Sequence, residues 1–106
     1  MSRMVQLACN IGLNYLHKNQ IIHRDLKPAN IFRMERSFKI GDMNVSKVLK
    51  SGEAASTKTG SPFYTAPEVW DEDGDGYSYK CDIWSLGVLV FELCSLQVPY
   101  EADSIF

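Results

Sequence analysis

The sequence predicts an α+β fold that is mainly helical and carries short strands near its middle. Apolar residues recur every three to four positions from Met4 to Tyr15, which is the period of one face of an amphipathic helix. Two short apolar runs, Ile31–Phe32 and Phe38–Ile40, flank a polar turn and are typical of short strands. The segment Ile83–Cys94 is apolar almost all round, which indicates a helix at the centre of a domain.

The remaining elements follow from local signals. We expect the first helix to end at Lys18, because a cation suits the last turn and Asn19 tolerates a left-handed cap. The apolar run Ile21–Ile22 follows, and Pro28 disfavours a helical conformation at the residue before it. Residues 42–68 are mostly small and polar, and so long a loop inside a compact domain is usually functional or disordered.

The composition is that of an ordinary globular domain. The chain has 106 residues, of which 45% are hydrophobic and 23% charged, so a modest core can form. The net charge of −2 argues against a general nucleic-acid binder, which needs a basic surplus. The longest apolar run, Ile83–Phe91, is shorter than the about 20 residues that cross a membrane. We therefore expect a soluble intracellular domain with neither nucleic acid nor membrane as a partner.

The three cysteines, Cys9, Cys81 and Cys94, are odd in number and too widely spaced for a zinc knuckle. Small hydrophobic residues of this kind are usually buried in proteins of a reducing compartment. We expect all three to be buried free thiols.

The most informative stretch is His23–Asn30, which combines a carboxylate, an ammonium group and an amide. Phosphoryl transfer needs a carboxylate near the attacking hydroxyl, positive charge on the transferring phosphate and hard oxygen ligands for magnesium. Asp25 can orient the hydroxyl and take its proton, and Lys27 can reach the γ-phosphate as a point charge. The side-chain oxygen of Asn30 suits Mg²⁺. Each residue alone fits a solvated loop, but the eight residues together match the protein-kinase catalytic loop.

The sequence resembles the eukaryotic protein kinases, and further motifs arrive in that family's order. Residues 42–44 (Asp-Met-Asn) stand where the family has Asp-Phe-Gly, and residues 66–68 (Ala-Pro-Glu) match the end of the activation segment. Residues 82–87 (Asp-Ile-Trp-Ser-Leu-Gly) resemble the start of the family's central buried helix. Lys27 followed by Pro28 resembles the catalytic-loop sequence of the serine/threonine kinases within this family. The resemblance implies a kinase-like α+β fold: a mainly helical C-terminal lobe with short strands around the catalytic loop.

The finer resemblance is to the NIMA-related (Nek) kinases. Residues 60–68 (Gly-Ser-Pro-Phe-Tyr-Thr-Ala-Pro-Glu) are similar to the Nek sequence Gly-Thr-Pro-Tyr-Tyr-x-Ser-Pro-Glu. Residues 80–87 and 99–102 (Pro-Tyr-Glu-Ala) resemble the Nek Lys-Ser-Asp-Ile-Trp-Ser/Ala-Leu-Gly and Pro-Phe-x-Ala. By family analogy, the resemblance implies a cytoplasmic kinase, with the cytoskeleton, the centrosome or the nucleus as further sites.

The resemblance implies ATP and Mg²⁺ as cofactors and assigns residues to them. Asp25 and Lys27 would be catalytic, and Lys27 would also contact ATP. Phe32 would lie under the adenine, with helix residues 89 and 93 beneath it. Asn30 and Asp42 would bind the metal ion and the nucleotide.

The resemblance also assigns substrate-positioning and regulatory roles. Ser61 would hydrogen-bond toward Asp25 and Lys27 and place the Ser or Thr acceptor of a protein substrate. Arg24 would receive a phosphate on the activation loop. Thr57 lies four residues before Ser61, which matches the spacing of the activating hydroxyl in Nek kinases. The competing interpretation is that Thr57 and the neighbouring hydroxyl residues are solvated loop positions.

Three residues are assigned to the support of the catalytic loop. His23 and Met43 would stack in the family's regulatory hydrophobic column. Asp82 would anchor this column by bonding to the backbone of the catalytic loop. We therefore expect His23 to be a packed core residue and not a proton carrier.

The resemblance covers residues 1–106 but only the middle of a kinase domain: the catalytic loop, the activation segment and the central helix. The sequence has no Gly-x-Gly-x-x-Gly loop and no Val-Ala-x-Lys strand. We expect the N-terminal lobe and the last C-terminal helices to be absent and the isolated chain to be inactive. Asn44 in place of the family's glycine leaves the carboxylate of Asp42 available.

Two alternatives remain open. The first is a catalytically inactive pseudokinase or scaffold, although the intact Asp25, Lys27, Asn30 and Asp42 argue against loss of catalysis by substitution. The second is a calcium-binding loop, because the acidic residues of 71–82 follow the start of an EF-hand. That loop has serine at its eighth position and aspartate at its twelfth, so an acidic surface turn is the simpler interpretation.

Overall fold

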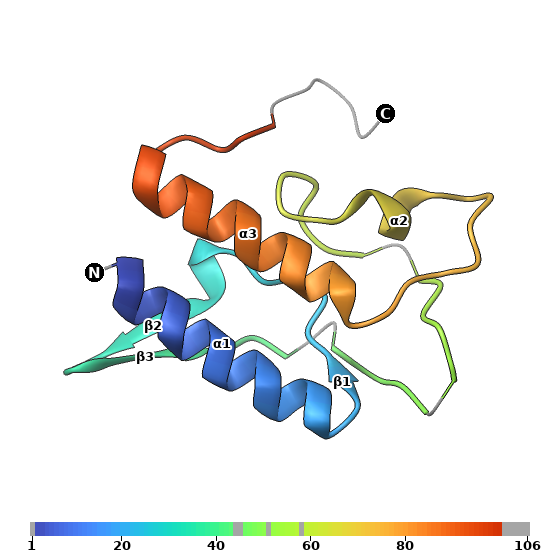
Figure 1. Cartoon of the computed structure of the whole chain (residues 1–106), viewed down its shortest axis with the longest axis horizontal. Coiled ribbons are helices and arrows are strands. Elements are labelled where there is room, and N and C mark those ends of the chain that lie inside the picture. The colour runs from blue at the N-terminus through green and yellow to red at the C-terminus, as the bar shows by residue number, and fades with distance from the viewer. Residues whose placement is uncertain (1, 44–45, 51, 58, 101–106) are drawn as a thin grey trace.

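The computed structural model describes residues 2–43, 46–50, 52–57 and 59–100. Two long helices dominate the molecule, and a small hairpin lies beside the first of them (Figure 1). The α+β class expected from the sequence is confirmed. The elements in chain order are α1 (Ser2–Lys18), β1 (Ile21–Ile22), η1 (Pro28–Asn30), β2 (Ile31–Met34), β3 (Ser37–Ile40), β4 (Lys47–Val48), α2 (Pro67–Trp70) and α3 (Lys80–Ser95).

Helix α1 ends at Lys18, as the sequence predicts, but its left-handed residue is not the expected one. Gln20, with φ of 62°, takes the positive backbone angle. The Asn19 side chain instead donates a hydrogen bond to the carbonyl of Tyr15, at 2.8 Å. Asn19 therefore gives one carbonyl of the last turn a side-chain donor in addition to its own backbone amide.

The apolar stripe that identifies α1 in the sequence is its exposed face. Val5, Cys9 and Leu13 form the buried face, which packs with α3 and the hairpin. Both stripes have helical spacing, so periodicity alone does not decide which of them contacts the core. The exposed stripe and β3 together line an apolar groove of about 580 Å³. The large side chains of this stripe are Met4, Leu7, Ile11 and Tyr15, exposed by 51%, 60%, 63% and 68%.

The strands form two separate antiparallel pairs. β2 and β3 form the expected hairpin, with Ile31 opposite Ile40. β1 pairs with β4, so residues 47–48 of the long polar segment form a strand that the sequence did not reveal. The helical turn α2 begins at Pro67, at the end of this segment, and was also not predicted.

The buried residues form two clusters. The first lies where α1 and α3 meet the hairpin and contains Leu26 and the fully buried Leu89. The second lies beneath the loops and joins β1 to the start of α3 through residues that lie between these two elements in the sequence. Its members are Ile22, Leu49, Ala55, Ala66, Val69, Tyr77 and Cys81. Leu49, Ala55, Ala66 and Tyr77 of the loops are therefore held in a core of their own.

Helix α3 is buried on one face only. Ile83 and Phe91 are 54% and 49% exposed, and the ring of Trp84 stacks on Tyr100 with centroids 5.8 Å apart. Cys94 is exposed, so the expectation that all three cysteines are buried was wrong for this residue. In the described part of the chain, no helix is sufficiently long and apolar to span a bilayer.

Candidate active site

The loop that follows β1 is fixed by one buried carboxylate in the first turn of α3. Asp82 is fully buried, and its two oxygens accept the backbone amides of His23 and Arg24, each at 2.9 Å. The Nε2 of His17 lies 2.8 Å from the same carboxylate. Arg24 has φ of 73°, a conformation that is rare for residues other than glycine and needs such support. The anchoring role expected of Asp82 is thus present as direct hydrogen bonds.

His23 links this loop to the segment that contains Asp42. Its fully buried ring accepts the amide of Asp25 at Nδ1, over 3.1 Å. Its Nε2 donates to the carbonyl of Gly41 over 2.8 Å, so the network fits the neutral ring with the proton on Nε2. With both nitrogens engaged, His23 is a packed residue, as expected. Met43 is 39% exposed and lines the groove beside α1.

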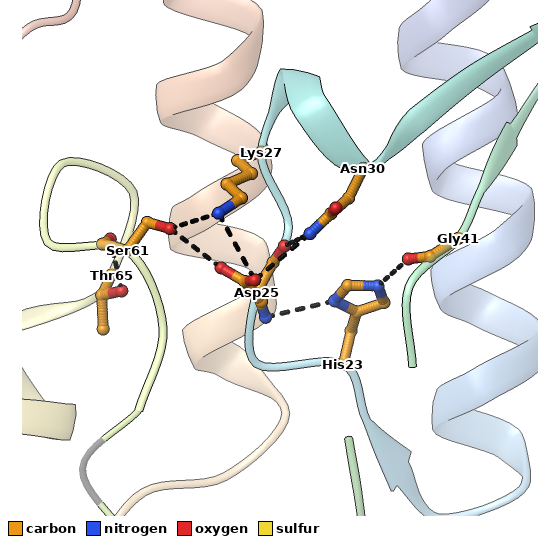
Figure 2. A network of polar contacts seen from close by, with 7 residues as sticks. All are labelled: His23, Asp25, Lys27, Asn30, Gly41, Ser61 and Thr65. Carbon is orange, nitrogen blue, oxygen red and sulfur yellow. Dashed lines mark hydrogen bonds and ion pairs between the residues drawn. The ribbon is translucent and has the colours of Figure 1, made fainter. Parts of the chain in front are cut away.

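Three predicted site residues meet at one point, as Figure 2 shows. The hydroxyl of Ser61 donates to Asp25 Oδ1 at 3.1 Å and accepts from Lys27 Nζ at 2.7 Å. Lys27 Nζ also lies 3.5 Å from Asp25 Oδ2. The side chains of Asp25 and Lys27 are 17% and 28% exposed, so both can reach a ligand at the surface. Ser61 makes both hydrogen bonds that the resemblance implies.

Asn30 ends the short helix η1 beside Asp25. Its Nδ2 donates to the carbonyl of Asp25 at 2.7 Å and to Oδ2 of the same residue at 3.3 Å. These bonds orient the amide so that Oδ1 is its remaining ligand atom. The carbonyl of Asn30 accepts the amide of Gly41 at 2.9 Å, which brings the neighbouring, exposed Asp42 to the same region. One amide oxygen and one carboxylate fit Mg²⁺, which is held by few protein oxygens together with water and phosphate.

Phe32 lies on the exposed side of the hairpin, packed against the backbone of Gly41. A Cβ atom at position 41 would come within 2.4 Å of the Phe32 ring, so this contact requires glycine. The ring is 49% exposed and available to a flat ligand. Leu89 and Leu93 belong to the cluster that contains Ile31, the neighbour of Phe32.

Arg24 and the segment of Thr57 meet through a residue that the sequence did not single out. Arg24 Nη1 donates to the hydroxyl of Tyr77 at 3.2 Å. That hydroxyl in turn donates to the backbone carbonyl of Thr57. No sequence motif marks Tyr77, because both of its polar partners are distant in the chain.

A second unpredicted pair fixes the loop that carries Ser61. The hydroxyl of Tyr64 donates to Glu92 at 2.6 Å, and Ser85 Oγ donates to the carbonyl of Tyr64 at 2.6 Å. Burial and the neighbouring Glu92 raise the pKa of Tyr64 to about 12, so its hydroxyl keeps its proton. Within the loop, Thr65 Oγ1 donates to the carbonyl of Ser61 at 2.7 Å (Figure 2). Ser61 is therefore held against α3 as well as against Asp25.

The structure does not favour the calcium-binding alternative. Asp82 is engaged by backbone amides of the loop 23–30, and Asp71 accepts the amide of Asp73 within its own turn at 3.0 Å. Across the residues that the structure describes, no group of three or more His, Cys, Asp and Glu side chains could hold a metal ion. The substitution Asn44 and the motif residues Glu101 and Ala102 lie outside the described residues.

Comparison with known proteins agrees with this geometry. The protein kinase domain family matches residues 2–105. Serine/threonine-protein kinase Nek3 of Mus musculus is 41% identical over 96 residues, which are 89% of this chain and 18% of that protein. The G2-specific protein kinase nim-1 of Neurospora crassa is 48% identical over 85 residues, which are 79% of this chain and 10% of that protein. Mitogen-activated protein kinase kinase kinase 1 of Arabidopsis thaliana is 47% identical over 92 residues, 85% of this chain and 15% of that protein.

The chain thus spans less than a fifth of the length of these relatives. Several of the similar proteins are Nek kinases, which confirms the resemblance to the NIMA-related group. The family match extends over almost all of the sequence, residues 2–105 of 106. The chain belongs to the protein kinase domain family.

Proposed function

We propose that the protein containing these residues is a serine/threonine protein kinase, which transfers the γ-phosphoryl group of ATP to Ser and Thr hydroxyls of protein substrates. The observation that carries the proposal is the convergence of Asp25, Lys27 and Ser61 within hydrogen-bonding and ion-pair distances. The similar proteins Nek3 and Nek11 of Mus musculus, which are serine/threonine-protein kinases, support the same reaction.

In the proposed reaction, the acceptor oxygen attacks the γ-phosphorus while the bond to the β-phosphate oxygen of ATP breaks. Asp25 accepts the proton of the acceptor hydroxyl, and ADP leaves. Lys27 places an ammonium charge beside the transferred group, where negative charge accumulates. Ser61 holds both side chains in one arrangement, which limits the reorganisation needed at the moment of transfer.

The nucleotide and its metal ion would be held on the other side of Asp25. Asn30 and Asp42 would bind Mg²⁺, which neutralises phosphate charge when bound. The bonds from Asn30 to Asp25 couple this metal ligand to the proposed base. The exposed ring of Phe32 would support the adenine.

We also propose that Thr57 is a regulatory phosphorylation site whose phosphate binds Arg24. The side chain of Thr57 is exposed, and only one hydroxyl group separates its carbonyl from the Arg24 guanidinium. A phosphate adds about −1.5 to −2 charges and makes strong hydrogen bonds to guanidinium groups.

The test of the reaction is the Asp25→Asn variant of the full-length gene product. Asparagine keeps the shape of the side chain and an oxygen for Ser61 but cannot take the acceptor proton. We expect kcat with a Ser/Thr peptide to fall by about 10²- to 10⁴-fold, with little change in Mg-ATP affinity. Asp42→Asn should weaken Mg-ATP binding as well, because it removes a charged metal ligand.

The matched control is Asp73→Asn, which removes a carboxylate from the exposed acidic turn and should leave both quantities unchanged. Turnover of Asp25→Asn close to that of the unaltered protein would refute the role of Asp25. Nucleotide binding without any phosphoryl transfer by the unaltered protein would instead favour the pseudokinase alternative.

A further inference from the structure

Tyr77 joins two segments that are distant in the sequence. Its backbone pairs with Ala55 through two hydrogen bonds, of 2.8 and 2.9 Å, in an isolated antiparallel bridge. Its side chain is 4% exposed and belongs to the cluster that contains Ile22 and Leu49. Tyr77 is therefore fixed both by its backbone and by the packing of its ring.

The hydroxyl of Tyr77 uses both of its hydrogen-bonding capacities. It donates its proton to the carbonyl of Thr57 and accepts a proton from Arg24 Nη1 at 3.2 Å. A phenolic hydroxyl has one proton to donate, so the two partners together determine its direction. The group is thus a bridge between residue 57 and the guanidinium of Arg24.

The residue before Tyr77 allows this close approach. Gly76 has φ of 93°, in the region that side chains disfavour. A Cβ atom at position 76 would lie 2.5 Å from the carbonyl oxygen of Ala55, far inside van der Waals contact. The pairing of residues 55 and 77 therefore requires glycine at position 76.

The other end of the bridge is equally well fixed. The amide of Arg24 donates to the buried carboxylate of Asp82, which holds the residue at its positive φ. Arg24 directly precedes Asp25, the proposed base. The backbone that carries the Arg24 side chain is therefore fixed directly beside the residue that would accept the substrate proton.

We propose that Tyr77 is a positioning residue that holds the Arg24 guanidinium and the segment 55–57 together, so that the receptor for a phosphate on Thr57 exists before phosphorylation. The inference rests on the proposed regulatory role of Thr57 and adds Tyr77 as the residue that places Arg24 to bind the phosphate. In the modification, Thr57 Oγ bonds to the γ-phosphorus of ATP, ADP leaves and the hydroxyl proton is released. A guanidinium has five N–H donors, so Arg24 can bind a phosphate while it keeps Tyr77.

The test compares the full-length gene product with its Tyr77→Phe variant, each with and without phosphate on Thr57. Phenylalanine keeps the ring and the backbone pairing and removes only the hydroxyl. We expect the activation by Thr57 phosphate to fall about tenfold in the variant, with the change mainly in kcat and not in the KM for ATP. Tyr79→Phe, in a tyrosine packed against the same cluster, is the matched control and should keep full activation.

Phosphorus NMR gives a readout that does not depend on activity. Arg24 should lower the second pKa of the Thr57 phosphate below its usual value of about 6, because a neighbouring cation favours the dianion. Tyr77→Phe should move this pKa back toward the usual value, and Tyr79→Phe should not. The melting temperatures of both variants show whether any difference comes from unfolding.

The outcomes separate this inference from the regulatory proposal on which it rests. Full activity of Thr57→Ala, or no activation by Thr57 phosphate in the unaltered protein, would overturn the regulatory role and the inference together. Normal activation in Tyr77→Phe, with an unchanged phosphate pKa, would overturn the role of Tyr77 alone. In the Arg24→Ala background, a further loss from Tyr77→Phe equal to its loss in the unaltered protein would show that Tyr77 does not act through Arg24.

Discussion

Replacement of Asp82 by asparagine tests how far one buried carboxylate holds the loop 23–30 in place. Asp82 accepts two backbone amides at 2.9 Å and lies 2.8 Å from His17 Nε2. Asparagine has one acceptor oxygen, and its NH₂ group takes the place of the other. That group is a donor and cannot accept a backbone amide, so the amide of His23 or of Arg24 loses its partner. The lost bonds are charge-assisted and the site is fully buried.

Each hydrogen bond to a charged group contributes about 1.5–3 kcal/mol, and two of them are weakened or lost. We therefore expect Asp82→Asn to lower the free energy of unfolding by about 3–6 kcal/mol. This is a large part of the about 5–15 kcal/mol that stabilises a typical domain. Because Asp25 directly follows these amides, kcat should fall as well.

The assay is thermal unfolding of the full-length gene product, followed by circular dichroism. The expected loss corresponds to a decrease in melting temperature of about 6 °C or more. Asp75→Asn, in the exposed acidic turn, removes the same charge without a buried partner and should change the melting temperature by less than about 1 °C. If Asp82→Asn unfolded at the same temperature as this control, the anchoring role of the carboxylate would be refuted.

Two further predictions follow from the site and the thiols. Ser61→Ala removes the hydroxyl that bonds to Asp25 at 3.1 Å, so kcat should fall about tenfold while the KM for ATP stays constant; a matching rise in that KM would contradict the assignment. At pH 8 a thiol reagent should modify Cys94 first, because burial raises the pKa of Cys9 to about 11 and that of Cys81 to about 12 and so suppresses their thiolates. Equal rates at all three cysteines, measured by mass spectrometry, would contradict the burial pattern.

Local signals were sufficient for most of the elements. The proline at position 28, the polar turn between β2 and β3 and the cation at the end of α1 act on neighbouring residues, and all three features are present as predicted. The types of residue in the loop 23–30 also indicated the protein kinase family, because phosphoryl transfer restricts which groups are useful.

Local signals were not sufficient to decide which face of a helix is buried or where a very short strand forms. Helix α1 has two apolar stripes, and the stripe of Val5, Cys9 and Leu13 is buried only because α3 and the hairpin lie on that side. Strand β4 consists of two residues whose partner is β1, and so short a pair has no alternation to reveal it.

The sequence by itself thus determined the family, the α+β class, the two long helices and the β2–β3 hairpin. The tertiary structure alone decided how these residues are supported: Asp82 beneath His23 and Arg24, Glu92 behind Tyr64, and Tyr77 between Arg24 and Thr57. The physical reason is the range of the interactions. Propensity and chemical type are properties of a residue and its neighbours, whereas a hydrogen bond between positions more than fifty residues apart exists only once packing has brought both groups together.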